Sequence, residues 1–203
     1  MLSGDVDTAP KASSIIPATT GPTNSGSVSF DIAFSEDVVN FNNSDDVTIT
    51  HSGTSNSGVS ITGSGSSYTA NVTGITGTGS FTLEVDTGSD VENTTGLALG
   101  ASVTSAPVNI DNTSPTAITV TPSTTGPTNA GSVSFDIGFS EDVVNFNDSA
   151  DITISHSDTS HGGLSVTGSG SIYTAEVTGI SGTGSFTLMV NTGSDVEDLS
   201  GIA

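Results

Sequence analysis

The chain of 203 residues carries 22 acidic residues against one basic residue, which gives a formal net charge of −21. A protein of this charge repels phosphate backbones and anionic lipid, so nucleic acid is excluded as a partner and direct membrane insertion is not expected. The lack of cysteine excludes disulfides and thiolate metal sites, and no stretch reaches the roughly 20 apolar residues of a membrane span.

An internal repeat organises the chain. Residues 17–98 and residues 122–203 are identical at 61 of 82 positions when they are aligned with an offset of 105 residues and no insertion. A repeat of this length defines the independent folding unit. We therefore expect a linker or the end of a preceding module over residues 1–10, module 1 over residues 11–110 and module 2 over residues 111–203.

Along module 1, Val, Ile, Leu and Phe alternate with Ser, Thr and Gly, the pattern of strands that bury one face. The alternation is strictest at Val28, Phe30, Ile32 and Phe34. Seven strands are expected, around Ile15, residues 28–34, Val47 to Ile49, Val59 to Ile61, residues 68–72, residues 81–85 and residues 103–110.

Seven short strands joined by Gly-rich turns predict an all-β fold. The module length favours an immunoglobulin-like seven-stranded β-sandwich over a barrel. We expect Val38, Val39 and Phe41 to close one end of the core of module 1. Module 2 stops at Ala203, the equivalent of Ala98, so the prediction is two tandem sandwiches of which the second lacks its last strand and either frays or borrows one.

The acidic residues are expected at one end of each module. Strand direction alternates along the chain, so the loops that hold the acids fall at the end where the linker enters, whereas the loops at the other end of module 1 hold no carboxylate. In module 1 this set is Glu36, Asp37, Asp90 and Glu92, with Asp45, Asp46 and Asp86 beside them. In module 2 it is Asp111, Glu141, Asp142, Asp195 and Glu197, with Asp151 and Asp198.

Clustered carboxylates repel one another unless a cation binds between them. Ca²⁺ accepts about 6–8 oxygen ligands in irregular loops, whereas Mg²⁺ requires a near-ideal octahedron. We therefore expect Ca²⁺ at the acidic ends, against the alternative that the acids are simply solvated. Asp45 and Asp86 are the weakest candidates, because module 2 has Ala150 and Asn191 in their places.

Three segments carry a resemblance to a known family. Residues 34–38 (FSEDV), residues 111–115 (DNTSP) and residues 90–96 (DVENTTG) are similar to the tandem bacterial Ig-like repeats of large surface adhesins. Such repeats form the extender regions of calcium-dependent, secreted adhesins of the RTX and biofilm-associated kind. The resemblance covers almost the whole chain, although Gly96-Leu97 stands where the family usually has Gly-Asn.

The resemblance implies a non-catalytic spacer on the bacterial cell surface, with neighbouring Ig-like modules as its partners and Ca²⁺ stiffening the joints. It also implies that Asp7 and Asn112, from the linkers, join the acidic loops as calcium ligands. The alternative is a module that binds a cell-surface glycan or a host ligand directly, which the near-identity of the two modules disfavours.

The remaining candidate sites are weaker. His51, His156 and His161 suggest a transition-metal site, but module 1 has Asn56 in place of His161, so exposed histidines are the simpler interpretation. No Ser–His–Asp arrangement lies on a motif turn, and an enzyme is not expected. Tyr68 and Tyr173 occupy apolar positions and are expected in the core rather than on a glycan-binding surface.

Overall fold

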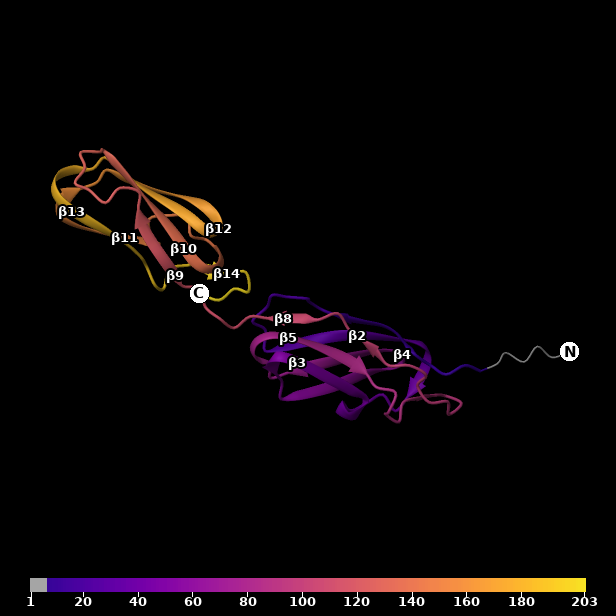
Figure 1. The fold of residues 1–203 in the computed structure, drawn as a ribbon. Helices are drawn as coiled ribbons and strands as arrows, with labels where there is room; N and C mark the ends of the chain where they lie inside the picture. The colour runs from indigo at the N-terminus through magenta and orange to yellow at the C-terminus, as the bar shows by residue number, and fades with distance from the viewer. Residues whose placement is uncertain (1–6) are drawn as a thin grey trace. The chain divides into compact units, whose positions relative to one another are not determined.

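The computed structural model describes residues 7–203 (Figure 1), so the first part of the linker predicted over residues 1–10 lies outside the described residues. The chain divides into two compact units, Met1–Asn112 (unit 1) and Thr113–Ala203 (unit 2). Each unit is built from antiparallel strands, and its two sheets enclose a core as in an immunoglobulin-like β-sandwich. The all-β prediction is confirmed.

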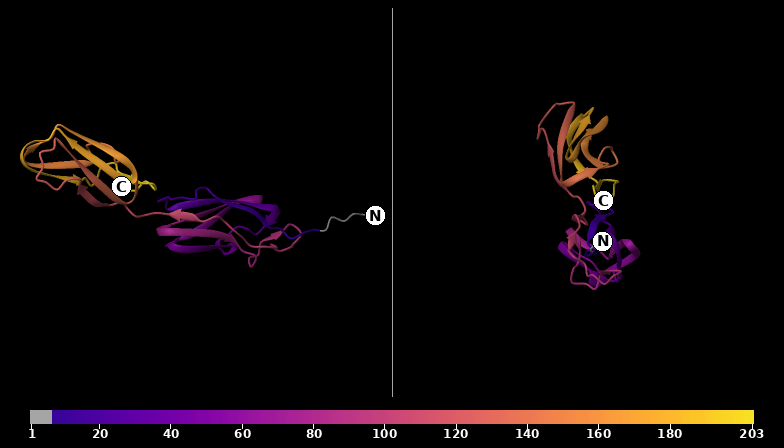
Figure 2. Two further views of the ribbon diagram at one scale, coloured as in Figure 1. Left: turned by 45° about the horizontal axis from the view of Figure 1, so that its top comes forward. Right: turned by 90° about the vertical axis from the view of Figure 1, so that its right-hand side faces the viewer.

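Unit 1 contains two sheets, which face each other in the ribbon views (Figure 2). The first sheet consists of β1 (Ala12–Pro17), β2 (Ser27–Val39), β4 (Gly58–Thr73) and β6 (Glu92–Asn93). The second consists of β3 (Val47–Ser55), β5 (Thr76–Val85), β7 (Val103–Thr104) and β8 (Val108–Ile110). A 3₁₀ turn, η1 (Ser44–Asp46), precedes β3.

The core of unit 1 follows the alternation read from the sequence. Val28, Phe30, Ile32 and Phe34 of β2 are all buried, with exposed fractions of 5% or less. Phe30 contacts Phe81 edge to face at 5.9 Å between ring centroids, which joins the two sheets. A strand that buries every second side chain places the whole set on one face, so the register of β2 is fixed by this core.

One end of the core is closed by aromatic rings, as predicted in part. Phe41 packs edge to face against Phe34 and Tyr68, at 5.1 Å in each case. Val38 is buried beside them. Val39 is 39% exposed, so its predicted place in the core is wrong, because it points to the other face of the strand.

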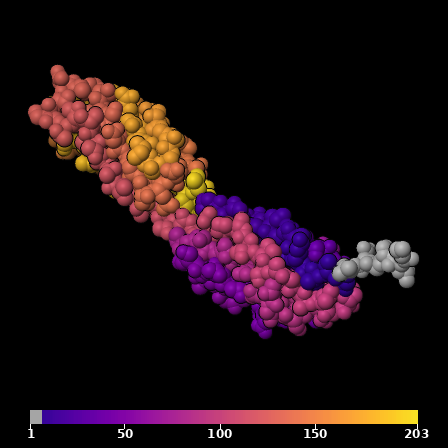
Figure 3. Space-filling view, turned by 45° about the vertical axis from the view of Figure 1, so that its right-hand side comes forward, coloured from indigo at the N-terminus to yellow at the C-terminus, as the bar shows by residue number. Residues whose placement is uncertain are grey.

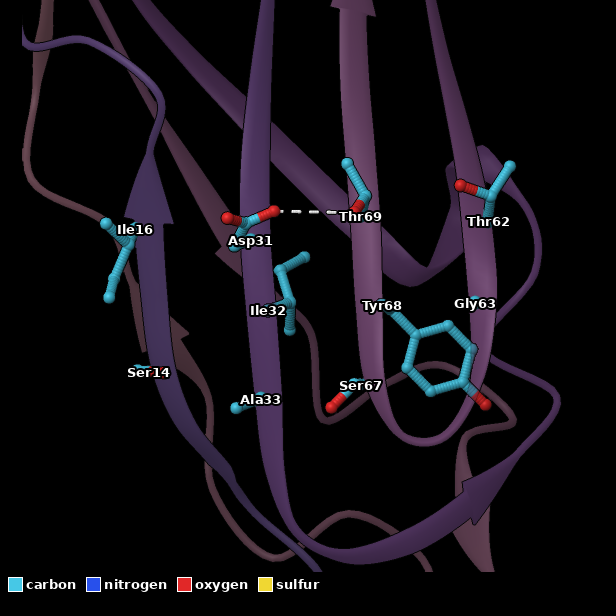
Figure 4. A pocket seen from close by; sticks show the side chains of 10 residues that line it. All are labelled: Ser14, Ile16, Asp31, Ile32, Ala33, Thr62, Gly63, Ser67, Tyr68 and Thr69. Carbon is cyan, nitrogen blue, oxygen red and sulfur yellow. Dashed lines mark hydrogen bonds between the residues drawn. The ribbon is translucent and has the colours of Figure 1, made fainter.

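Element β4 folds back on itself at Gly63 and Gly65, both of which have positive φ angles (134° and 65°). A Cβ atom on Gly63 would lie 2.6 Å from the Cα atom of Tyr68, so only glycine fits between the two arms. Figure 4 shows the arms of this hairpin, with Thr62 on one and Tyr68 on the other. The reversal predicted between the fourth and fifth strands is therefore present.

Three segments differ from the predicted pattern. Residues 35–39 continue β2 instead of starting a loop, and residues 51–55 belong to β3 instead of to a turn. The predicted seventh strand is divided into β7 and β8, both of which pair with β5. Pro107 lies in the gap between β7 and β8 and has no N–H to donate to a neighbouring strand. In the same gap, the N–H of Ser105 donates to Leu83 O of β5 at 2.8 Å.

The first and last segments of unit 1 run side by side on its surface, where Figure 3 shows the indigo N-terminal strand beside the later magenta chain. The N–H of Gly100 donates to Pro10 O at 2.8 Å, and the N–H of Asn109 donates to Thr20 O at 3.0 Å. These bonds attach the last segment of unit 1, which includes β8, to its first segment.

Unit 2 repeats the first sheet but only half of the second. Strands β9 (Ala117–Pro122), β10 (Ser132–Val144), β12 (Gly163–Thr178) and β14 (Glu197–Asp198) form one sheet. The other sheet has only β11 (Ile152–Ser160) and β13 (Ser181–Val190). Within the described part of unit 2, no strand takes the places of β7 and β8.

The free edge of β13 leaves the core of unit 2 incompletely covered. Phe186, Leu188 and Val190 are only partly buried, whereas their equivalents in β5 are 0–1% exposed. Unit 2 has a hollow that is lined by apolar side chains, including Phe139 and Val190, and by polar ones such as Thr116 and Asn191. In unit 1 the equivalent of Val190 pairs with Val103 of β7, so the hollow corresponds to the place of that strand.

A grafted strand tests this interpretation. Appending a copy of residues 99–112 after Ala203 should raise the free energy of unfolding of unit 2 by roughly 2 kcal/mol, because it covers the three partly buried side chains of β13. Hydrogen exchange read by mass spectrometry should show new protection in residues 181–190. A graft with Val108 and Ile110 both changed to Asp serves as the control, and equal protection from both grafts would contradict the interpretation.

The buried tyrosines provide a second test. The hydroxyl groups of Tyr68 and Tyr173 donate to Val38 O (3.0 Å) and Val143 O (2.9 Å). Replacing each by Phe should cost its unit about 1 kcal/mol, because one buried carbonyl loses its partner. The loss is measured by urea unfolding followed by circular dichroism.

The same tyrosines predict a dependence on alkaline pH. Burial, and to a lesser extent the charge of Asp37, raises the pKa of Tyr68, and burial with Asp142 does the same for Tyr173. The stability that these groups contribute is present below the unfolded pKa of about 10 and is lost as the pH rises through the folded pKa. The double Phe variant should lose less stability above pH ~10 than the parent protein, and an equal loss would refute the assignment.

Candidate metal centre

A buried amide connects two carboxylates in unit 1. Asn93, at the end of β6, is 1% exposed. Its Oδ1 accepts hydrogen bonds from the backbone N–H groups of Thr95 and Leu97, both at 3.0 Å. The amide is therefore fixed with its Nδ2 directed away from the loop, where it donates to Asp7 Oδ1 at 3.1 Å and to Glu36 Oε2 at 3.2 Å.

This arrangement satisfies the carboxylates without a metal ion. The neutral amide of Asn93 donates one N–H to each of the two carboxylates. The Thr95 hydroxyl contacts both Asp7 Oδ2 and Asn93 Oδ1. A cation between Asp7 and Glu36 would meet the hydrogens of the Asn93 amide. The residues of unit 1 therefore do not fit a calcium ion at this position.

Unit 2 has a carboxylate where unit 1 has the amide. Asp198 is the equivalent of Asn93, is 2% exposed, and has the same loop bonds: its Oδ1 accepts from Ser200 N and Ile202 N, both at 2.8 Å. The Ser200 hydroxyl lies 2.8 Å and 2.9 Å from the two oxygens of Asp198. A carboxylate oxygen of Glu141, the equivalent of Glu36, lies within 4.8 Å of one of Asp198.

The surroundings keep Asp198 ionised. Burial is the largest influence and would raise the pKa of this carboxyl, but the hydrogen bonds from Ile202, Ser200 and Gly201 act together in the other direction. The net result is a pKa below the ordinary value. The buried carboxylate of Asp198 and the partly exposed carboxylate of Glu141 provide the hard oxygen ligands that Ca²⁺ prefers. The residues of unit 2 fit a calcium ion.

The neighbouring acids predicted as ligands lie elsewhere. Glu92 and Glu197 are the partners of Val39 and Val144 in short antiparallel pairings, next to the inward-facing Asn93 and Asp198. Adjacent residues of a strand point to opposite faces, so Glu92 and Glu197 do not share the face of Asn93 and Asp198.

Asp37 and Asp142 are likewise separated from Glu36 and Glu141. Asp37 lies over the β4 hairpin, where its Oδ1 would be 3.1 Å from a Cβ atom on Gly65, and Asp142 has the same relation to Gly170. Both contribute to raising the pKa of the tyrosine beneath them. These carboxylates are associated with the hairpin.

Asp90 and Asp195 are exposed in both units. Their backbone carbonyls accept hydrogen bonds from Asn40 Nδ2 and Asn145 Nδ2, at 3.1 Å in each case. The contact that each unit repeats at this position is thus a backbone contact that fixes the acidic loop.

The linker residues Asp111 and Asn112 are held by unit 1. The N–H of Asp111 donates to Thr23 O at 3.0 Å. The N–H of Asn112 donates to Thr78 Oγ1 at 3.0 Å, and its Nδ2 donates to Gly77 O at 2.7 Å. Asn112 thus attaches the segment after β8 to the start of β5.

The residues that the sequence interpretation missed are Asn93 and Asp198 as the central pair. Asn93 is not among the predicted ligands, and Asp198 is predicted at the acidic end but not as a ligand. Two features of the sequence could have indicated this pair. The repeats differ here by Asn against Asp, and a Gly follows three residues later, which lets the loop turn its N–H groups back toward the side chain.

Two further acids are fully buried but serve the loop. Asp46 is 1% exposed, and its Oδ2 accepts from Asn42 N (2.9 Å) and Asn43 N (3.0 Å). Asp151 does the same in unit 2 with Asn147 N (3.0 Å) and Asp148 N (3.2 Å). Within residues 7–203 no hydrogen bond reaches the Oδ1 of either residue. Each carboxylate holds a turn closed beneath the aromatic end of the core.

Asp86 has a structural partner as well. Thr48 Oγ1 donates to Asp86 Oδ2 at 2.6 Å, and Thr153 Oγ1 donates to Asn191 Oδ1 at 2.7 Å in unit 2. An amide oxygen replaces a carboxylate oxygen without loss of this bond, so the fold accommodates either residue. The charge of Asp86 is not needed for the contact.

The comparisons with known proteins add little. No protein-family model and no curated protein matches the chain. Among solved structures, the titin domains Z1Z2, determined in complex with telethonin, are similar at 12% identity over 93% of this chain and 92% of that one, with a TM-score of 0.31. In the described residues, no helix is long and apolar enough to cross a membrane.

The buried acids give a prediction for stability. Asp46→Ala removes the acceptor of two backbone N–H groups and should lower the free energy of unfolding of unit 1 by about 1–3 kcal/mol, whereas Asp46→Asn keeps an acceptor and should cost less. Urea unfolding and hydrogen exchange over residues 40–48 measure the effect. Asp45→Ala is the control, since unit 2 has Ala150 at that position, and an equal loss in this variant would contradict the proposed role of Asp46.

Proposed function

We propose that the chain is a non-catalytic spacer of a bacterial surface adhesin, a segment of tandem Ig-like units stiffened by Ca²⁺. The observation that carries the proposal is the buried position occupied by Asn93 in unit 1 and by Asp198 in unit 2. Asn93 is an amide that bridges two carboxylates, whereas Asp198 is itself a carboxylate that lies near the carboxylate of Glu141, and a cation bound there would offset both charges. The resemblance of the acidic loops to adhesin extender repeats supports the same function.

The tandem similarity also supports a mechanical role. Two units that agree at 61 of 82 aligned positions carry the same core and the same loops, which suits an element repeated for length. A recognition domain requires a distinctive surface, whereas the two units share most of their residues. The proposed location is extracellular, where millimolar Ca²⁺ suits sites with a Kd of about 10⁻⁴–10⁻³ M.

The residues of unit 2 would bind the ion through their oxygen atoms. Asp198 would be held in place by Ser200 N and Ile202 N, and a carboxylate oxygen of Glu141 lies close enough to bind the same ion. Asp111 remains a ligand predicted from the sequence. Bound Ca²⁺ supplies the positive charge that the carboxylates lack, and it stabilises the folded state by mass action.

Direct glycan recognition is the alternative, and the surface of unit 1 offers it little support. The depression in Figure 4 is lined by Ile16, Asp31, Thr62, Thr69 and neighbouring small residues. Thr69 Oγ1 already donates to Asp31 Oδ1, at 3.4 Å. The ring of Tyr68 is buried, and its hydroxyl is bonded to Val38 O, so it does not provide a stacking platform for a sugar.

A reciprocal exchange tests the calcium site. Asp198→Asn should remove one Ca²⁺ site from the chain, because it places amide hydrogens where the ion would bind. Asn93→Asp should add one site, because it converts the amide bridge of unit 1 into a third carboxylate beside Asp7 and Glu36. Isothermal titration calorimetry with CaCl₂ counts the sites in the full chain, and small-angle scattering with Ca²⁺ or with chelator reports extension.

The outcomes separate the two functions. Calcium binding that Asp198→Asn abolishes, with shorter maximum dimensions in chelator, supports the spacer. Unchanged calcium binding in Asp198→Asn would refute the proposed site. Binding of the parent chain to a glycan array without any effect of Ca²⁺ on its dimensions would favour the alternative.

A further inference from the structure

Two histidines of unit 2 meet where β11 leads into β12: His156 lies in β11, and His161 lies in the short segment between the two strands. His156 Nε2 lies 2.7 Å from His161 Nδ1, and the two rings are nearly parallel, with 19° between their planes. Both side chains are exposed, as the sequence predicted. At this separation one ring donates a hydrogen bond to the other, and a slight widening would allow one metal ion, at about 2.0–2.1 Å from each nitrogen, to replace the shared hydrogen.

The hydrogen bonds behind His156 fix its tautomer. Thr159 Oγ1 donates its only hydrogen to Ser185 O at 3.0 Å. His156 Nδ1, which lies 2.9 Å from Thr159 Oγ1, must therefore be the donor of that bond. The neutral ring then carries its lone pair on Nε2, directed at His161. Histidine ligands of metals are usually oriented in this way, by a hydrogen bond from the other ring nitrogen.

Unit 1 has the same support but a different partner. His51 Nδ1 lies 2.9 Å from Thr54 Oγ1, which donates to Ser80 O at 2.9 Å. Its Nε2 faces Asn56 Oδ1 at 2.8 Å, and Asn56 Nδ2 donates to Gly58 O at 3.1 Å. The amide is thus committed to its own turn. Unit 1 therefore offers one imidazole where unit 2 offers two.

We propose that His156 and His161 form a two-histidine binding site for a divalent transition-metal ion such as Zn²⁺ or Cu²⁺. Imidazole nitrogen suits these ions, whereas Ca²⁺ prefers oxygen, so the site is chemically distinct from the acidic pair Glu141 and Asp198. His156 binds through Nε2 and His161 through Nδ1, with the proton of the latter ring moved to its Nε2. Water completes the coordination of the ion.

The test uses the full chain titrated with ZnCl₂ in saturating CaCl₂, which occupies oxygen sites first. Calorimetry should show one Zn²⁺ per chain, and NMR of the imidazole nitrogens should show shifts in His156 and His161 but not in His51. His161→Asn recreates the arrangement of unit 1, so it preserves the fold. It should weaken Zn²⁺ binding by roughly 10²-fold, since the second ligand otherwise binds at high effective concentration.

The reciprocal variant Asn56→His provides the matched gain of function. It should create a second Zn²⁺ site, with shifts in His51, because the Thr54 and Ser80 support is already present in unit 1. Zn²⁺ binding that is unaffected by His161→Asn, or that is lost in Asp198→Asn instead, would overturn the proposal. Asp198→Asn tests the calcium site alone, and His161→Asn tests the histidine site alone. The failure of one proposal can therefore be told from the failure of the other.

Discussion

The alternation of side chains along β2, and along β10 in unit 2, is the constraint on which each unit depends. These strands pair with three others in their sheet, so their register determines the positions of the neighbours. Their inward residues, among them Phe30 and Phe135, contact the opposite sheet. The same strands continue into the acidic segment, so Glu36 and Glu141 are positioned by the core that precedes them.

Buried polar groups in both units satisfy each other in repeated ways. The loop after β6 and β14 directs its N–H groups at the side chain of residue 93 or 198, and the turn before β3 and β11 directs its N–H groups at Asp46 or Asp151. These bonds stabilise loops that have little apolar surface to bury. They also fix side-chain orientation, which allows one Asn-to-Asp difference to change the chemistry of a site without changing the backbone around it.

The differences between the repeats thus carry more functional information than their identities. Where Asn191 replaces Asp86, the same hydrogen bond is retained, and the difference has no consequence for the fold. Where Asp198 replaces Asn93, an amide donor becomes an oxygen acceptor beside a second carboxylate. Where His161 replaces Asn56, an amide bound to its own turn becomes an imidazole directed at His156. Each replacement acts on an unchanged framework.

The sequence by itself determined the repeat, the all-β architecture, most of the strands and the core, because a period of two specifies which residues share a face. It also located the acidic segments at one end of the strands. Only the tertiary structure decided that Asn93 and Asp198 face inward while Glu92 and Glu197 do not, that Asp46 is buried, and that two histidines meet. These features depend on bulges, loop paths and hydrogen bonds between residues far apart in the chain, which side-chain periodicity does not encode.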